Sequence, residues 1–323
     1  MAKLLKAATA GAAVTAVLGA AGCAAVGNVF YNQLITRKAV NKKHRPRKLE
    51  PATRAALVKD RGLITDPADW YDCIEHEEMI LISGRGERLH AEVFNQKEPV
   101  SRWALICHGW TNWPEGMALY EKKYYELGFN VLVPYLDGHE KSERDRAGMG
   151  WSDRLNVVDW INHLVTLDPG CEIILHGVSM GAATVMMTTG EDLPDNVKCA
   201  VEDCGYTTVW DIGVEMLRYM IGLPVHPIIE SARAVIRLRA GYDIKTASSL
   251  TQIQKSKTPT LFLHGTQDDF VPYWMRDVCY DNCSAEKERV SIPDAAHANS
   301  ATTHPELYWD SVISFISRYI NLT

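Results

Sequence analysis

The chain has no excess of positive charge and no regular pattern of cysteines and histidines. Its 34 lysines and arginines are outnumbered by 40 aspartates and glutamates, which gives a formal net charge of −6 at pH 7. A broad nucleic-acid surface needs a basic excess, so the composition disfavours nucleic acid as a partner. No Cys/His run has the spacing of a structural zinc site, and we expect neither a metal nor a cofactor.

Internal repeats are absent, and low-complexity tracts are absent outside the N-terminus. A chain of 323 residues with 46% hydrophobic residues is long enough and apolar enough for one large α/β domain or two small ones. Nothing in this composition indicates disorder.

The eight cysteines do not form the framework of a small secreted protein. Cys107, Cys171 and Cys199 lie in or beside apolar runs, which is typical of small core residues. Cys279 and Cys283 are four residues apart on a predicted helix, where a disulfide is geometrically awkward. We therefore expect mostly reduced thiols.

Charged residues are also missing between Lys6 and Arg37. The apolar run Ala7–Tyr31 within this interval is long enough to cross a bilayer as a helix. We interpret residues 1–36 as a signal-anchor, because apolar character continues past Cys23 without a polar boundary. The sequence thus predicts membrane association through this segment.

Two alternatives remain for the N-terminus. One is a cleaved secretory peptide, and the other is a lipoprotein signal that ends at Cys23. The second departs from the usual pattern, since Ala20 stands where a larger aliphatic residue is common.

Residues 37–65 are predicted to be a basic linker, and residues 66–323 the folded domain. The cluster NKKHRPRK, residues 41–48, would by itself place this domain on the cytoplasmic side of a membrane. The same charges also suit anionic headgroups or a solvated linker, so the side of the membrane stays open.

Strand and helix patterns alternate along the domain, which predicts a largely parallel sheet with helices on both faces. Strands are expected at residues 77–83, 88–94, 103–109, 130–136, 171–177, 197–205, 259–265 and 289–293. The first two should form a hairpin at the sheet edge. Between residues 207 and 250 the alternation stops, and two helices with a proline-containing break are expected as an insertion.

The stretch HGVSMG places Ser179 between Gly177 and Gly181. It follows an apolar strand and precedes a helix of small residues, which is the setting of a nucleophile elbow. In such an elbow Ser179 adopts strained backbone angles, and the two glycines relieve crowding between strand and helix. The alternative is a glycine-rich turn without chemistry.

A serine needs a base to remove its proton and an acid to orient that base. His297 lies on a loop between the last predicted strand and the last helix, and we expect it to be the base. Asp268, just past the preceding strand, is the preferred acid. Asp203 and Asp269 are the alternatives.

The oxyanion of such a reaction needs hydrogen-bond donors, typically the amide after the nucleophile and one from an earlier loop. Met180 N–H is the expected first donor. Trp110 N–H is the expected second, with Thr111 as its alternative. His108 is interpreted as a structural residue that braces this loop.

With these residues the chain resembles the α/β-hydrolase superfamily, and more closely the bacterial monoglyceride lipases and serine aminopeptidases. The resemblance covers about residues 75–320 and rests on HGWTN, GHEKS, HGVSMG, HGTQDDFVP and the His297 loop. It implies an α/β-hydrolase fold with an eight-stranded, mostly parallel sheet, a small helical cap after the sixth strand at about residues 207–250, and Ser179, Asp268 and His297 as the triad. One departure is Glu140, where these families often have glycine.

The function expected from these residues is hydrolysis of carboxylic esters through an acyl-enzyme, with a small-molecule substrate whose acyl group is hydrophobic or lipid-like. The apolar side chains of the cap either line an acyl pocket or simply pack it onto the core; they are Trp210, Met216, Tyr219, Met220, Ile221 and Leu223. A serine peptidase or aminopeptidase is an alternative, with Glu215 or Glu230 as the site for a substrate amine. Acyl transfer and a non-catalytic, membrane-anchored binding protein are further alternatives.

Overall fold

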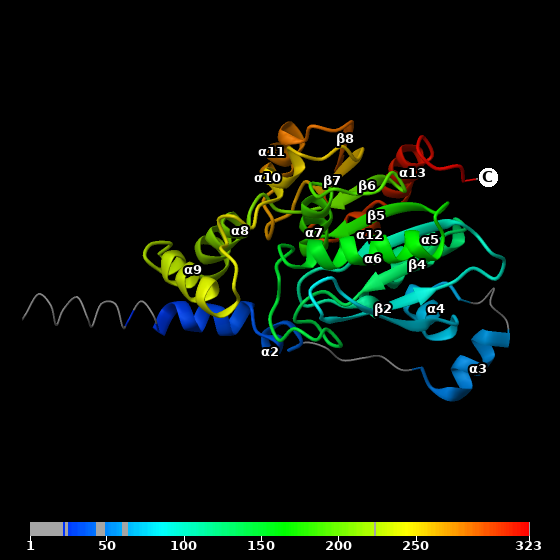
Figure 1. The fold of residues 1–323 in the computed structure, drawn as a ribbon, viewed down its shortest axis with the longest axis horizontal. Coiled ribbons are helices and arrows are strands. Elements are labelled where there is room, and N and C mark those ends of the chain that lie inside the picture. The colour runs from blue at the N-terminus through cyan, green and yellow to red at the C-terminus, as the bar shows by residue number, and fades with distance from the viewer. Residues whose placement is uncertain (1–21, 23–24, 43–48, 60–63, 223, 323) are drawn as a thin grey trace, which may run out of the picture.

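The computed structural model describes residues 22, 25–42, 49–59, 64–222 and 224–322 of the chain. An eight-stranded sheet with helices on both sides occupies its centre (Figure 1). The strands are β1 (Glu77–Ile82), β2 (Arg88–Phe94), β3 (Arg102–Cys107), β4 (Asn130–Pro134), β5 (Glu172–Val178), β6 (Val197–Asp203), β7 (Thr260–Gly265) and β8 (Lys287–Ile292). Their order in the sheet is β1-β2-β4-β3-β5-β6-β7-β8.

The sheet has the direction pattern that the sequence predicts. β1 and β2 form an antiparallel hairpin at one edge, and β2 is antiparallel to β4. All the remaining pairs, from β4 through β8, are parallel. Because parallel strands need a crossover between them, the intervening helices cover the faces of the sheet.

Alternate side chains of β3 show how the two faces are buried. Leu105 and Cys107 belong to the hydrophobic cluster that includes α6 (Asp153–Leu167) and α7 (Met180–Thr188). The neighbouring residue Ile106 belongs to the other cluster, together with α5 (Ala118–Glu126) and α13 (Pro305–Ile316). The core therefore has two layers, one on each side of the sheet.

The other helices of the domain are shorter or lie nearer its edges. They are η2 (Pro114–Met117), α3 (Pro51–Lys59), α4 (Pro67–Cys73), α10 (Ser249–Ile253), α11 (Trp274–Asn282) and α12 (Ser300–Thr303).

A helical cap is inserted between β6 and β7, as predicted. It consists of α8 (Val209–Glu215), the π-helix η3 (Met216–Ile221) and α9 (Ile228–Arg239). Ile229, Ala232 and Ile236 are buried at spacings of three and four residues. This stripe turns one face of α9 toward the rest of the protein.

Residues 25–42, called the N-terminal segment below, pack onto the domain. They form a helix at residues 25–34 and the short helix α2 (Arg37–Val40). The first helix lies against α9 of the cap (Figure 1). Val40 is fully buried, and Arg37 N–H donates to the backbone oxygen of Asp145 at 2.8 Å.

This packing differs from the expected linker over residues 37–65. The sequence predicts a basic linker here, either solvated or lying on anionic headgroups, but the Arg37 guanidinium donates to the backbone oxygens of Glu140, Ser142 and Arg144. Residues 37–42 are therefore part of the folded domain.

Most of the predicted membrane span, including Cys23, lies outside the described residues. Among the residues that the structure does describe, no helix combines the length and the apolar character that a membrane crossing requires. At the end of the apolar run, Phe30 and Tyr31 are buried in the protein.

The seven cysteines within the described part of the chain are all buried and free. Cys279 and Cys283 are among them, which agrees with the expectation that this pair forms no disulfide.

Candidate active site

Ser179 lies in a sharp turn between β5 and α7. Its backbone angles are φ 58° and ψ −117°, a conformation that side-chain-bearing residues rarely adopt. A Cβ on Gly177 would lie 2.2 Å from the oxygen of Gly181, and one on Gly181 would lie 1.9 Å from the oxygen of Cys107. The predicted strain at the serine and the predicted role of both glycines are confirmed.

Ser179, His297 and Asp268 are hydrogen-bonded in series. His297 Nε2 lies 2.8 Å from Ser179 Oγ, and His297 Nδ1 lies 2.7 Å from Asp268 Oδ2. The ring of Phe270 stacks on the imidazole with its centroid 4.8 Å away. The geometry suits proton transfer from the serine hydroxyl to a histidine whose other nitrogen is held by a carboxylate.

The Asp268 carboxylate is fixed by the turn in which it lies. Its Oδ1 accepts the backbone N–H groups of Phe270 at 3.0 Å and Val271 at 2.8 Å. Burial raises the pKa of Asp268, but hydrogen bonds from His264 and His297 outweigh it and lower the pKa to about 2. The carboxylate is thus ionised at neutral pH.

The two alternative acids are placed differently. Asp269 is exposed. Asp203 is buried at the end of β6, where its Oδ1 accepts the Ser300 hydroxyl at 3.0 Å. Burial raises the pKa of Asp203 to about 6. The structure therefore brings Asp268, and neither alternative, into hydrogen bonding with His297.

A second histidine contacts the same carboxylate and was missed by the sequence interpretation. His264 Nε2 lies 3.2 Å from Asp268 Oδ2 and 2.9 Å from the backbone oxygen of Val271. Both side chains are fully buried. The spacing of four residues in HGTQD was the available signal, but it does not distinguish a contact with the aspartate from simple packing.

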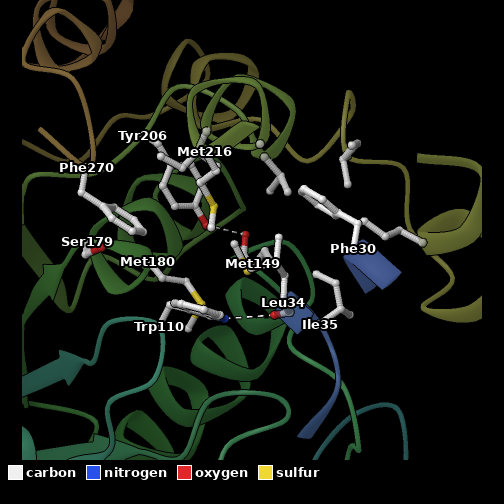
Figure 2. Close-up of a pocket in the computed structure, with 15 residues that line it drawn as sticks. Phe30, Leu34, Ile35, Trp110, Met149, Ser179, Met180, Tyr206, Met216 and Phe270 are labelled. Carbon is white, nitrogen blue, oxygen red and sulfur yellow. Dashed lines mark hydrogen bonds between the residues drawn. The ribbon is translucent and has the colours of Figure 1, made fainter. Parts of the chain in front are cut away.

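Trp110 and Met180, the predicted sources of oxyanion donors, both line the same pocket as Ser179 (Figure 2). Trp110 lies in a tight turn closed by a 3.1 Å bond from Asn112 N–H to the oxygen of Gly109. Thr111, the alternative donor, has a positive φ of 60° in this turn. The loop therefore holds its backbone in a strained, fixed shape beside the serine.

His108 braces this loop, as expected. Its Nδ1 lies 2.9 Å from the oxygen of Gly109, and its Nε2 accepts the N–H of Leu136 at 3.2 Å. Burial, together with the nearby His139, lowers the pKa of His108 well below its usual value. A neutral imidazole with Nδ1 as donor satisfies both bonds.

The pocket beside Ser179 is apolar. None of the 15 described residues that line it carries a charge. Its walls come from Trp110 in the loop after β3, α7, the cap, the N-terminal segment and the loops that carry Met149 and Phe270. Met149, Met180 and Met216 are its flexible members. The N-terminal contribution, from Phe30, Leu34 and Ile35, was not foreseen from the sequence.

The predicted acyl-pocket residues of the cap are only partly placed. Met216 lines the pocket. The ring of Trp210 instead lies 4.0 Å from Lys245 Nζ, which covers it. Leu223 and the side chains of residues 219–221 lie outside the described part of the chain.

The two glutamates considered for a substrate amine lie elsewhere. Glu230 is exposed and lies 2.5 Å from His226 Nδ1. Glu215 is at the end of α8 and, like Glu230, is not among the described residues that line the pocket.

One group of possible metal ligands occurs among the described residues, with ligand atoms of Cys204, Asp268 and His297 within 4.8 Å of one another. Asp268 and His297 are hydrogen-bonded to each other at 2.7 Å. Their proximity is therefore explained by the relay to Ser179.

Residues 138–323 match the model of the prolyl oligopeptidase family. The uncharacterized protein YqkD of Bacillus subtilis is 29% identical over 214 residues, 66% of this chain and 70% of that protein. The thermostable monoacylglycerol lipase of a Bacillus species is 21% identical over 243 residues, 67% of this chain and 90% of that enzyme. A Pyrococcus furiosus esterase superposes with a TM-score of 0.63 at 19% identity, covering 79% of this chain and 95% of its own.

Proposed function

Since the chain belongs to the prolyl oligopeptidase family, within the α/β-hydrolase superfamily, we propose that it is a serine hydrolase that cleaves carboxylic esters with a hydrophobic acyl group. The family and the fold make it a hydrolase of the α/β-hydrolase type. The serine mechanism and the ester preference are the parts that the proposal adds.

One observation carries the ester preference: an uncharged, apolar pocket opens directly on Ser179 (Figure 2). An acyl chain placed there loses its contact with water and gains about 25 cal/mol for each square ångström buried. A substrate ammonium group would lose its hydration and find no carboxylate among the described lining residues. The pocket therefore favours an acyl group over a free amino terminus.

In the proposed reaction, His297 Nε2 takes the proton from Ser179 Oγ as that oxygen attacks the ester carbonyl. Asp268 holds the imidazole and stabilises its protonated form. The backbone N–H groups of Met180 and Trp110 bind the developing oxyanion.

His297 then gives the proton to the departing alkoxide, which leaves as an alcohol. Water, activated by the same histidine, releases the carboxylic acid from Ser179.

Peptide cleavage is the second candidate, because the family whose model matches is named for a peptidase. In this case the apolar pocket would hold a hydrophobic side chain or a blocked amino terminus. The uncharged lining argues against an aminopeptidase that holds a free ammonium group.

Labelling with a fluorophosphonate probe tests the catalytic serine. We expect the parent to label and Ser179→Ala to lose labelling. Ser311→Ala is the matched control, since its hydroxyl bonds to the oxygen of Leu307 on α13, and it should label like the parent. Failure of the parent to label, or equal labelling of Ser179→Ala, would favour a non-catalytic protein.

A substrate panel then separates ester from peptide cleavage. It contains p-nitrophenyl esters of increasing acyl length, free aminoacyl anilides and N-acylated aminoacyl anilides. We expect kcat/KM to be highest for the esters. Faster cleavage of either class of anilide would replace the ester preference with the peptidase alternative.

A further inference from the structure

The pocket extends from Ser179 to the N-terminal segment. Figure 2 shows Ser179 near one end, Met180, Met149 and Met216 between, and Phe30 at the opposite end. An acyl chain attached to the serine would therefore extend toward Phe30. The wall of the pocket at that end is made by residues that precede the matched family region at 138–323.

Phe30 belongs to a buried stripe on the helix at residues 25–34. Gly27, Phe30 and Tyr31 are buried, while Val29 between them is 59% exposed. The Phe30 ring reaches the backbone of α8, where a Cβ added to Gly213 would lie 3.8 Å from its Cζ. Phe30 thus lies against α8 of the cap at this end of the pocket.

Polar contacts hold this wall in place on the cap side. Arg239 of α9 donates to the side chain of Asn28, and its guanidinium lies 4.2 Å from the ring of Tyr31. A Cβ on Gly27 would lie 2.5 Å from the backbone oxygen of Ser231, so the helix and α9 are in close backbone contact.

The other end of the segment is tied to the catalytic domain. Ala147 N–H donates to the backbone oxygen of Ile35 at 2.7 Å, on the strand-like bridge between Thr36 and Arg146. The indole N–H of Trp110 donates to the backbone oxygen of Leu34 at 3.0 Å (Figure 2). The far wall of the pocket is therefore hydrogen-bonded to the loop whose Trp110 N–H is proposed to bind the oxyanion.

The cavity between these walls is small, with a volume of about 30 Å³, enough for one or two water molecules. An acyl chain therefore enters only as lining side chains move aside. Rotation of the methionine side chains can widen the middle of the pocket. The ring of Phe30 is stiffer, and it lies against α8 at Gly213.

We propose that the N-terminal segment sets the acyl-chain length that the enzyme accepts, with Phe30 as the end wall of the acyl pocket. The proposal rests on the esterase function proposed above. It assigns a specificity role to residues that the sequence pattern assigns to a membrane span.

The test measures kcat/KM of the full-length protein on p-nitrophenyl acetate, butyrate, hexanoate, octanoate and laurate. We expect the parent to prefer the short esters. Phe30→Ala should move the optimum to longer chains, with a gain of about fourfold in relative kcat/KM for each further methylene group accommodated. Phe30→Leu should move it in the same direction by a smaller amount, and it preserves more of the packing.

Val29→Ala is the matched control, because the side chain one residue earlier on the same helix faces away from the pocket. It should keep the parental profile. A parent that prefers laurate, or a Phe30 variant that loses activity equally on all esters, would overturn the chain-length role while leaving the esterase function standing. A parent that cleaves none of the esters would instead overturn the esterase function, and the chain-length role with it.

Discussion

His264 Nε2 and His297 Nδ1 both point at Oδ2 of Asp268, at distances of 3.2 Å and 2.7 Å. Oδ1 of the same carboxylate accepts two backbone N–H groups. Both oxygens of the buried Asp268 carboxylate are therefore held by neighbouring N–H groups. This fixes the orientation of the carboxylate and, with it, the plane in which His297 is held. We interpret His264 as a positioning residue for the acid.

The His264 contact predicts a loss of turnover when the donor is removed. His264→Ala should lower kcat about tenfold to a hundredfold with little change in KM, because a hydrogen bond to an ionised group is lost far from the substrate. His264→Gln retains an N–H donor and should recover part of the activity. Steady-state kinetics on a short ester measure both effects. Equal activity of the two variants, with both folded by circular dichroism, would contradict the positioning role.

Because Asp268 is proposed as the acid, substitutions at Asp268 and at its neighbour Asp269 should have very different effects on kcat. Asp268→Asn should lower kcat about 10⁴-fold, because an amide cannot hold the tautomer in which His297 accepts the serine proton. Asp269→Asn, at an exposed position, should stay within about twofold of the parent. Comparable losses in both variants, measured as kcat on the same ester, would show that the turn has been assigned wrongly.

The sequence could predict the arrangement of the candidate site because its parts are local and ordered. Gly177, Ser179 and Gly181 are required by backbone crowding within one turn, and Asp268 and His297 follow strands whose ends meet at one edge of a parallel sheet. The choice of Asp268 over Asp269 was preferred from the motif, but its physical reason lies in the bonds from Phe270 and Val271.

The N-terminal segment was beyond the sequence interpretation because composition alone does not distinguish a membrane helix from a buried one. A signal was nevertheless present: Gly27, Phe30, Tyr31 and Leu34 follow a helical spacing, and the polar residues Asn32 and Gln33 lie off this stripe, although Val29 does too. The residues that cover this stripe are in α9 and at Gly213 of α8, about two hundred residues away in the chain. The sequence around Phe30 therefore gives no sign of which residues cover the stripe.

Close packing at the elbow predicts that Gly181 is indispensable for stability. Gly181→Ala should reduce the free energy of unfolding by about 4–5 kcal/mol or prevent folding, because its Cβ would lie 1.9 Å from a backbone oxygen. In Gly170→Ala the nearest atom is 3.4 Å away, and this variant should match the parent. Urea denaturation measures the difference, and equal midpoints would contradict the packing shown for the elbow.

The buried carboxyl of Glu202, on β6 behind the site, leads us to predict that the stability of the protein depends on pH. Its Oε2 accepts the N–H of Gly205 at 3.0 Å, while Oε1 has no hydrogen-bond partner among the described residues. Burial raises the pKa of this carboxyl to about 8. The folded protein thus keeps a proton that the unfolded chain loses near pH 4.3, and this group lowers stability progressively as the pH rises from there to about 8.

Glu202→Gln removes that titration while keeping the acceptor oxygen for Gly205. We expect its melting temperature to exceed that of the parent at pH 8, and the difference to shrink as the pH is lowered to 5. Glu98→Gln, at an exposed position, is the control and should follow the parent at both values. Melting curves by differential scanning fluorimetry across this range provide the measurement. A difference that is constant with pH, or larger at pH 5, would mean that Glu202 is already ionised in the folded protein.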